Sequence, residues 1–198
     1  MKRKILVAAL VLLFAFSAVC GTMAYFTTQG TATNVITSGS IAAEIREYAD
    51  REMTKPFENL TGVMPGDAAI KVVTVENTGA NEAWVRLSVT KEYELAEERA
   101  AVRGADEIAR QEIKTLVHLD INSEYWTEQD GFYYYNEILK PGETTEPLFT
   151  SITLDKTLGN VWQEAKFKIL VHMDAVQVAN NGATVLEAAG WPNNGGES

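Results

Sequence analysis

Histidine and cysteine, which supply most metal ligands and many catalytic groups, are almost absent from this chain. Its 198 residues include one cysteine and two histidines, His118 and His172. An aspartate follows each histidine two positions later, Asp120 or Asp174, but a third histidine and an H-E-x-x-H motif are missing. We therefore interpret both as surface histidines on strands. Because G-x-S-x-G and phosphate-binding glycine loops are also missing, we expect no enzyme, no metal site and no cofactor. A secreted hydrolase that uses the acidic residues and the two His-x-Asp pairs is the alternative.

Positive charge is also in short supply. The chain has 17 Lys and Arg against 27 Asp and Glu, a net charge of −10. An acidic surface argues against binding to nucleic acid, where basic patches supply most of the affinity. It argues equally against binding to an anionic membrane surface.

An apolar run long enough to cross a bilayer comfortably is missing as well. The basic residues at positions 2–4 precede an apolar stretch at 5–19, and small residues follow. This order is that of a secretory signal, and the stretch is shorter than the roughly 20 residues of a membrane-spanning helix. We predict a signal peptide over residues 1–24, cleaved between Ala24 and Tyr25. An uncleaved membrane anchor is the alternative.

The single cysteine, Cys20, lies at the end of this apolar run. We interpret Cys20 as a small apolar residue of the signal. Lipidation of Cys20 is the alternative, but the branched Val19 precedes Cys20 where a lipoprotein signal would have a small residue. Cleavage after Ala24 would leave 174 residues without cysteine, which excludes a disulfide, a thiolate metal site and a cysteine nucleophile. The remaining 14 Lys and Arg against 27 acidic residues give a net charge of −13.

What is present is mostly the pattern of β-strands, in which apolar and polar residues alternate. Turn signals separate the strands, namely Pro65-Gly66, Asp130-Gly131 and Pro141-Gly142. About eight short strands with such turns indicate an all-β fold, an antiparallel β-sandwich over residues 40–190. An N-terminal arm, residues 25–39, precedes it, and we expect a disordered tail at 191–198. The predicted strands are 40–47, 69–77, 83–93, 116–121, 125–126 with 132–139, 148–154 and 166–178.

One segment departs from this pattern. Residues 94–111 are rich in Ala, Glu and Arg and almost free of β-branched residues. We predict a short helical insertion there, with Gly104 as a weak point or a break. One or two further helical turns are expected within residues 183–191.

Aromatic residues gather around the predicted hairpin. The interpretation that we favour is that alternate rings fill the core while the others cover a cross-strand neighbour. The alternative is a face that stacks on sugar rings, which would make the protein a polysaccharide-binding module at the cell surface. The candidate glycan-facing aromatics are Trp126, Tyr133, Tyr134 and Tyr135.

Three segments resemble the TasA/camelysin (CalY) family of exported proteins. The junction GTMAYFTTQGTATNVITSGSI is similar to the family's signal-to-mature boundary, and MPGDAAIKVVTVENTG resembles its turn, strand and Glu-Asn-x-Gly turn. A third segment, Trp126 with DGFYYYNEILKPGETTEPLF, is similar to exported proteins with this signal type. The junction residues that match are Gly21, Thr22, Ala24, Phe26, Asn34, Gly39 and Ile41.

The resemblance implies a jelly-roll sandwich and a structural role as fibres of a Gram-positive biofilm matrix. It also implies export through a SipW-type signal peptidase and an extracellular or cell-surface location. The partners would then be further copies of the chain and other matrix components, with no membrane contact after cleavage. Camelysin has been described as a metalloprotease, but this sequence has no zinc motif to which that activity can be transferred.

The N-terminal arm suits assembly by strand addition. It carries no charge and no proline over residues 25–35, and an extended arm of this kind can add to an open sheet edge of another copy. A head-to-tail contact of this type need not close into a ring of subunits, so filaments would result. The alternative is an arm that is disordered or folds on its own domain. The predicted assembly residues are Tyr25, Phe26, Thr27, Thr28, Thr31, Thr33 and Val35.

Overall fold

The computed structural model describes residues 41–57, 66–162 and 164–192. The chain divides into two compact units, Met1–Thr33 and Asn34–Ser198, and the described residues all belong to the second. The predicted signal peptide, its cleavage site and the N-terminal arm lie outside the described residues.

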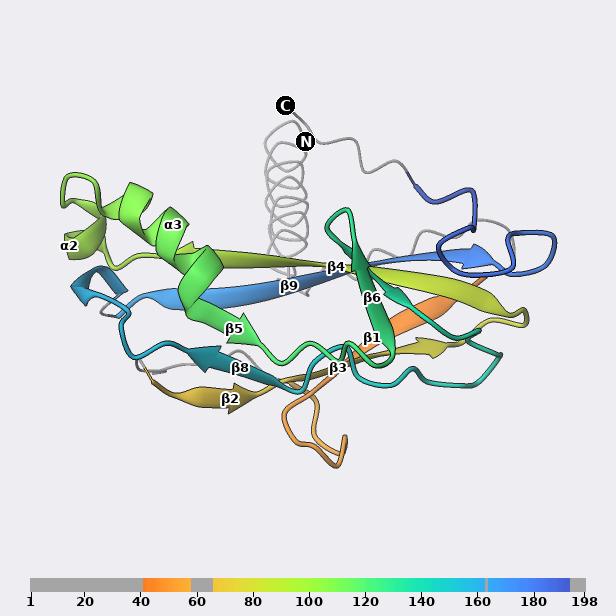
Figure 1. Cartoon of the computed structure of the whole chain (residues 1–198). Helices are drawn as coiled ribbons and strands as arrows, with labels where there is room; N and C mark the ends of the chain where they lie inside the picture. The colour runs from red at the N-terminus through yellow and green to blue at the C-terminus, as the bar shows by residue number, and fades with distance from the viewer. Residues whose placement is uncertain (1–40, 58–65, 163, 193–198) are drawn as a thin grey trace, which may run out of the picture. The chain divides into compact units, whose positions relative to one another are not determined.

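Strands dominate the described part of the chain, as Figure 1 shows. Two short helices and one 3-10 turn interrupt them. The elements are β1 (Ala43–Tyr48), β2 (Ala68–Ile70), β3 (Val72–Asn77), β4 (Ala83–Glu94), α2 (Glu97–Ala100), α3 (Ala105–Leu116), β5 (Val117–Leu119), β6 (Trp126–Gln129), β7 (Phe132–Tyr135), β8 (Ser151–Leu154), η1 (Asn160–Trp162) and β9 (Lys166–Gln177).

The first layer combines two antiparallel groups of strands. β1 pairs with β3, and β8 lies between β2 and β5. Backbone hydrogen bonds join β3 to the irregular segment that leads into β8, for example from Val73 N to Phe149 O (3.1 Å) and from Asn77 N to Glu143 O (3.0 Å). These bonds make the two groups continuous.

The second layer is an antiparallel sheet with the order β6-β7-β4-β9. β4 and β9 pair over their full length, from Ala83 opposite Gln177 to Glu94 opposite Lys166. The predicted hairpin joins β6 to β7 and is confirmed. Asp130 and Gly131 both have positive φ, 53° and 80°, as a two-residue turn of the primed type requires.

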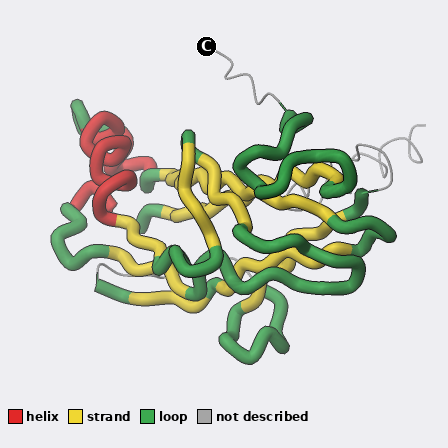
Figure 2. Tube along the Cα trace, turned by 45° about the vertical axis from the view of Figure 1, so that its right-hand side comes forward, coloured by secondary structure: helices red, strands yellow, loops and turns green. Residues whose placement is uncertain are grey.

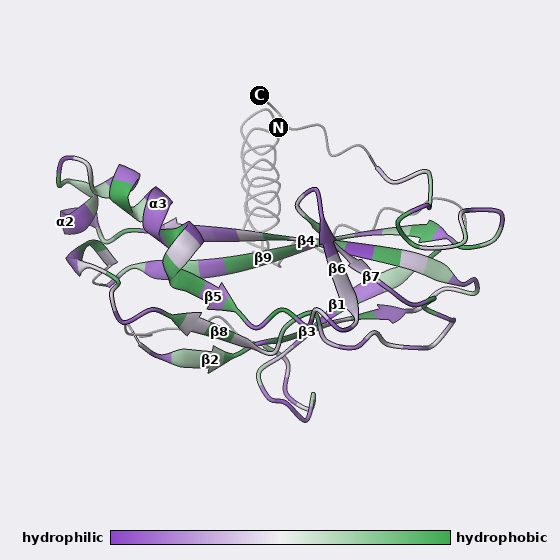
Figure 3. Ribbon diagram, viewed as in Figure 1, coloured by the Kyte–Doolittle hydropathy of each residue, from purple (hydrophilic) through white to green (hydrophobic). Residues whose placement is uncertain are grey.

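The two layers share one hydrophobic core. Val73 and Val75 of β3, Val85 and Leu87 of β4, and Met173 of β9 all belong to it. Hydrophobic and hydrophilic residues alternate along β4 and β9, as Figure 3 shows, because successive strand residues point to opposite faces. The predicted all-β antiparallel fold is confirmed.

The helical insertion is confirmed with different bounds. β4 continues to Glu94, and Gly104, with φ of 83°, separates α2 from α3. α3 ends at Leu116 instead of residue 111, and the strand predicted from 116 begins one residue later. The helix continues because Ala105, Ala109 and Ile113 form one buried stripe at four-residue spacing. Figure 2 shows both helices at one end of the layers.

The C-terminal predictions need two corrections. Residues 183–191 form turns without a helix. Trp191 and Pro192 are not part of a disordered tail, because both contact Arg86 of β4. Residues 178–192, which we name the strap, cover the outer face of the second layer, where Trp84 and Tyr134 pack with Val185 and Ala188. In Figure 1 the strap is the blue loop beyond β9.

The Glu-Asn-x-Gly turn connects β3 to β4 through a buried amide. Asn77 is fully buried, and its side chain donates to Asn81 O and Leu139 O (both 2.8 Å) while accepting from Gly79 N (2.9 Å). A Cβ at Gly79 would lie 2.7 Å from Ala42 N, which requires glycine there. Ala42 directly precedes β1, so this close contact also fixes where the chain enters β1.

Candidate functional site

The outer edge of β9 is the strongest candidate for a functional site. β9 is the last strand of the second layer, and no strand in the described parts of the chain pairs with its outer side. The edge is twelve residues long. Unpaired backbone groups of such an edge are a template for another extended chain.

One side chain from the first layer contacts this edge. Lys71, at the junction of β2 and β3, is 3% exposed, and its Nζ donates to Ile169 O of β9 (3.2 Å). The same ammonium pairs with Glu47 Oε1 of β1 (2.9 Å) and lies 4.3 Å from the centre of the Phe57 ring. β1 and β9, one edge strand from each layer, are thus bridged by one buried lysine.

The outer side of β1 is partly covered. Ala49 N donates to Lys55 O (2.9 Å) and Phe57 N donates to Glu47 O (3.0 Å), so the chain folds back along the end of β1. An isolated bridge between Tyr48 and Pro56 belongs to the same return. β1 is therefore less available for pairing than β9.

A second buried cluster lies beneath the strap. Arg86 Nε donates to Asp174 Oδ2 (2.9 Å), Nη1 to the Tyr134 hydroxyl (3.2 Å) and Nη2 to Pro192 O (2.8 Å). The guanidinium also stacks 3.8 Å from the centre of the Phe132 ring. Every donor nitrogen of Arg86 has a partner here, so the cluster holds the strap to the sheet.

The two His-x-Asp pairs have different environments. His118 is exposed, as predicted, and lies 3.8 Å from Asp155 Oδ2, while Asp120 bonds to the loop before β8. His172 is not an ordinary surface residue, because its side chain is 30% exposed and its Nε2 lies 3.3 Å from the buried Asp174 Oδ1. That contact lacks hydrogen-bond geometry. The local sequence could not reveal this environment, since Asp174 pairs with Arg86, which is 88 positions away in the sequence.

The candidate glycan-facing rings do not form an exposed platform. Trp126, Tyr134 and Tyr135 are 1%, 7% and 5% exposed, and Tyr133 is half-buried. Burial raises the pKa of the Tyr133 and Tyr135 hydroxyls. The burial of three of these four rings argues against a stacking face built on them. Trp126 and Tyr135 fill the core, and Tyr134 packs under the strap.

Metal and membrane features can be stated only for the described residues. No group of three or more His, Cys, Asp or Glu is arranged there to hold a metal ion. Within the same residues, no helix has the length and apolarity needed to cross a bilayer.

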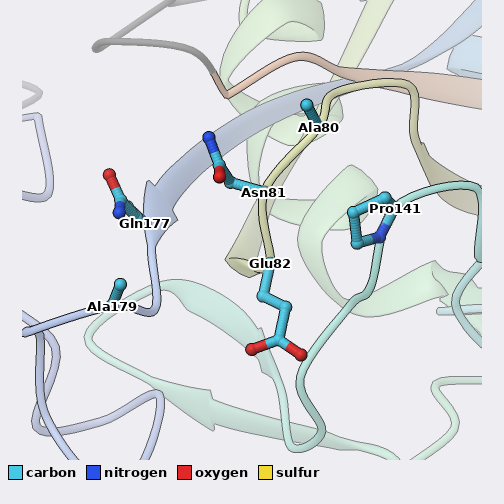
Figure 4. Close-up of a pocket in the computed structure, with 6 residues that line it drawn as sticks. All are labelled: Ala80, Asn81, Glu82, Pro141, Gln177 and Ala179. Carbon is cyan, nitrogen blue, oxygen red and sulfur yellow. The ribbon is translucent and has the colours of Figure 1, made fainter.

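A small hollow lies at one end of the layers (Figure 4). It has a volume of about 230 Å³, below the roughly 300 Å³ at which ligand pockets begin. Glu82 is its one charged lining residue. We do not assign a ligand to it. Its lining residues are Ala80, Asn81, Glu82, Pro141, Gln177 and Ala179.

Comparisons of the chain with protein-family models, with curated proteins and with solved structures returned no match.

Proposed function

We propose that this chain is an exported structural protein of an extracellular biofilm matrix. In this proposal a SipW-type signal peptidase cleaves after Ala24 and releases the N-terminal arm, residues 25–39. The arm of one copy adds as a strand to the next copy, and fibres grow by repeating this contact. Other matrix components would be further partners.

The observation that carries the proposal is the outer edge of β9, with which no strand of residues 41–57, 66–162 or 164–192 pairs. Its twelve residues exceed the average strand, so most of a fifteen-residue arm can be hydrogen bonded there. The core-facing side chains of this strand, Ile169, Val171 and Met173, are buried and apolar, so alternate residues of a docked strand would extend the same apolar face. Burial of Tyr25 or Phe26 would contribute about 1.5–3 kcal/mol each.

The strand connections support a jelly-roll form of the sandwich. The chain crosses between layers from β3 to β4, from β4 to β5, from β5 to β6, from β7 to the segment before β8, and from β8 to β9. A jelly roll contains two Greek keys and crosses repeatedly between its two sheets, and these crossings are compatible with that form. In a closed roll the first and last strands are neighbours, whereas β1 pairs with β3 and leaves β9 open. The proposed arm would fill this gap.

The test is negative-stain electron microscopy of the purified exported chain, combined with N-terminal sequencing. We expect a mature chain that starts at Tyr25 and forms fibres, and a variant lacking residues 25–35 that stays monomeric. Equal polymerisation by both forms would remove the arm from the mechanism. An exported chain that still carries residues 1–24 would contradict the processing step.

The two alternatives have less support. A polysaccharide-binding module on Trp126 and Tyr133–Tyr135 would need rings that are accessible, and three of the four are buried. A camelysin-like metalloprotease would need a metal-binding group of side chains, and the described residues offer none. Zinc analysis of the purified protein would test the second alternative directly.

A further inference from the structure

Lys71 and Glu47 form an ion pair that faces the core instead of the solvent. Glu47 lies opposite Val73 in the β1–β3 register, and Val73 is a core residue, so the Glu47 side chain points inward. Lys71 precedes Val73 by two positions and shares its face. The Lys71 side chain is 4% exposed and that of Glu47 is 19% exposed.

Burying two charges costs free energy, so a buried ion pair at this position calls for an explanation other than stability. Apolar residues of similar volume are often at least as stabilising as a buried ion pair, so the pair adds little to stability by being charged. Inward-pointing charges are instead one of the ways in which proteins protect an open sheet edge from other chains. The position of Lys71 fits that purpose, because its ammonium contacts the open edge itself.

The contact with Ile169 is what blocks the edge. Lys71 Nζ donates to the backbone oxygen of Ile169, the fourth residue of β9. A strand added along β9 would have to bring its own N–H to this edge and displace the ammonium. Hydrogen bonds from a charged donor are about twice as strong as neutral ones, so the exchange is opposed until Lys71 moves away.

We propose that Lys71 and Glu47 act as a clasp that closes the strand-accepting edge of β9 and slows capture of an arm. The inference rests on the proposed function and adds a mechanism that limits the rate of arm capture. Glu47 is the more exposed partner, so the pair can swing towards solvent together without separating its charges. In the captured state Ile169 O accepts from the arm, and Lys71 lies outside the seam.

The experiment measures capture of a fluorescent synthetic peptide of residues 25–39 by the purified full-length exported chain, followed by anisotropy. The double variant Lys71→Met/Glu47→Gln, which removes both charges, should capture the peptide at least about tenfold faster than the wild type. The conservative variant Lys71→Arg keeps a charged donor and should remain slow.

Lys91→Met is the matched control. Lys91 is half-buried and its Nζ also donates to a strand carbonyl, Val117 O (2.6 Å), but on β5 at the far edge of the first layer. This variant should capture the peptide at the wild-type rate. Acceleration by Lys91→Met without acceleration by the double variant would overturn the clasp and place the accepting edge at β5.

A second measurement uses only the wild-type chain and does not depend on the folding of a variant. Acetylation of Lys71, followed by mass spectrometry, should be slow in the free protein and increase at least about tenfold when the peptide is bound, because the clasp has opened. The exposed Lys140 should react equally in both states.

The outcomes separate the clasp from the proposed function. Equal capture rates for the wild type and the double variant, with Lys71 still protected in the complex, would overturn the clasp and leave strand addition standing. Absence of capture by every variant would overturn strand addition, and the clasp with it.

Discussion

Two charged pairs in this fold, four residues in all, are largely shielded from solvent, and the strand pattern does not explain why. Arg86 and Asp174 lie on the outer face of the second layer, where alternation predicts solvent, yet they are 6% and 1% exposed. Lys71 and Glu47 lie on the inner face, where alternation predicts an apolar residue. In both cases a partner from another part of the chain satisfies the charge.

At this scale, Asp174→Asn should lower the free energy of unfolding by about 3–5 kcal/mol. The variant leaves the Arg86 guanidinium buried without a carboxylate, and an uncompensated buried charge costs that much. Urea unfolding at neutral pH measures the change. Glu94→Gln is the control, since it breaks the exposed pair with Lys166 and should leave the free energy of unfolding unchanged. Equal effects of both substitutions would contradict the importance of burial.

Among the elements, the short strands depend on side-chain clamps as well as on their own pairing. β5 has three residues, and Asp120 just beyond it accepts hydrogen bonds from Thr150 Oγ1 (2.6 Å), Thr150 N (2.8 Å) and Ser151 N (2.6 Å). Burial raises the pKa of Asp120, but these hydrogen bonds lower it by more, so the net pKa lies below its ordinary value of 3.8. The carboxylate therefore stabilises the junction of β5 and β8 when ionised.

This clamp predicts a pH dependence at the element scale. Because the pKa of Asp120 is lower in the folded state, its contribution is complete above the unfolded pKa and is lost as pH falls through the folded pKa. Asp120→Asn should be less stable than the wild type at pH 7, and the difference should shrink below pH 3.8.

Urea midpoints measured from pH 7 down to about pH 3 test this expectation, a range that spans the ordinary pKa of aspartate. Asp130→Asn is the control, because asparagine also tolerates the positive φ of that turn position. The Asp130 carboxylate accepts from Gln129 Nε2 in the hairpin turn and lies outside the junction of β5 and β8, so comparison of the two variants isolates the clamp. A constant difference for Asp120→Asn would show that its ionised form is not what stabilises the junction.

Other elements show where local pattern is sufficient. The Asp130-Gly131 hairpin and the Gly104 break follow from residues that accept positive φ, and both are present as predicted. The end of α3 was predicted too early, because Thr115 and Leu116 precede a β-branched strand and the buried stripe that extends the helix depends on packing. The strap was missed for the same reason, since its short turns are held by Asn181 and Arg86.

For the whole molecule, the acidic charge predicts how the proposed assembly responds to salt. The proposed mature chain would carry a net charge of −13 and repel its copies, and ionic strength shortens that repulsion from a range of roughly 30 Å at 10 mM to about 8 Å at 150 mM. Light scattering of the purified exported chain should therefore show a shorter lag as salt rises. Lowering the pH should act in the same direction, because protonation of carboxylates reduces the negative charge of the chain.

The same series on the variant lacking residues 25–35 is the control. If the arm is what joins the copies, this variant should scatter weakly at every salt concentration tested. A lag that does not change with salt in the intact chain would show that charge does not restrain assembly.

By itself the sequence determined the all-β class, the alternating strands, the turns at Asp130-Gly131 and Pro141-Gly142, and a helical insertion divided at Gly104. These features follow from preferences that act within a few residues, such as the two-residue period of a strand and the positive φ of glycine. Only the tertiary structure decided which faces and edges are covered. Arg86 is buried by a strap about one hundred residues later, and Lys71 contacts Ile169 across the sandwich, because such contacts depend on how the layers pack and leave no local signal.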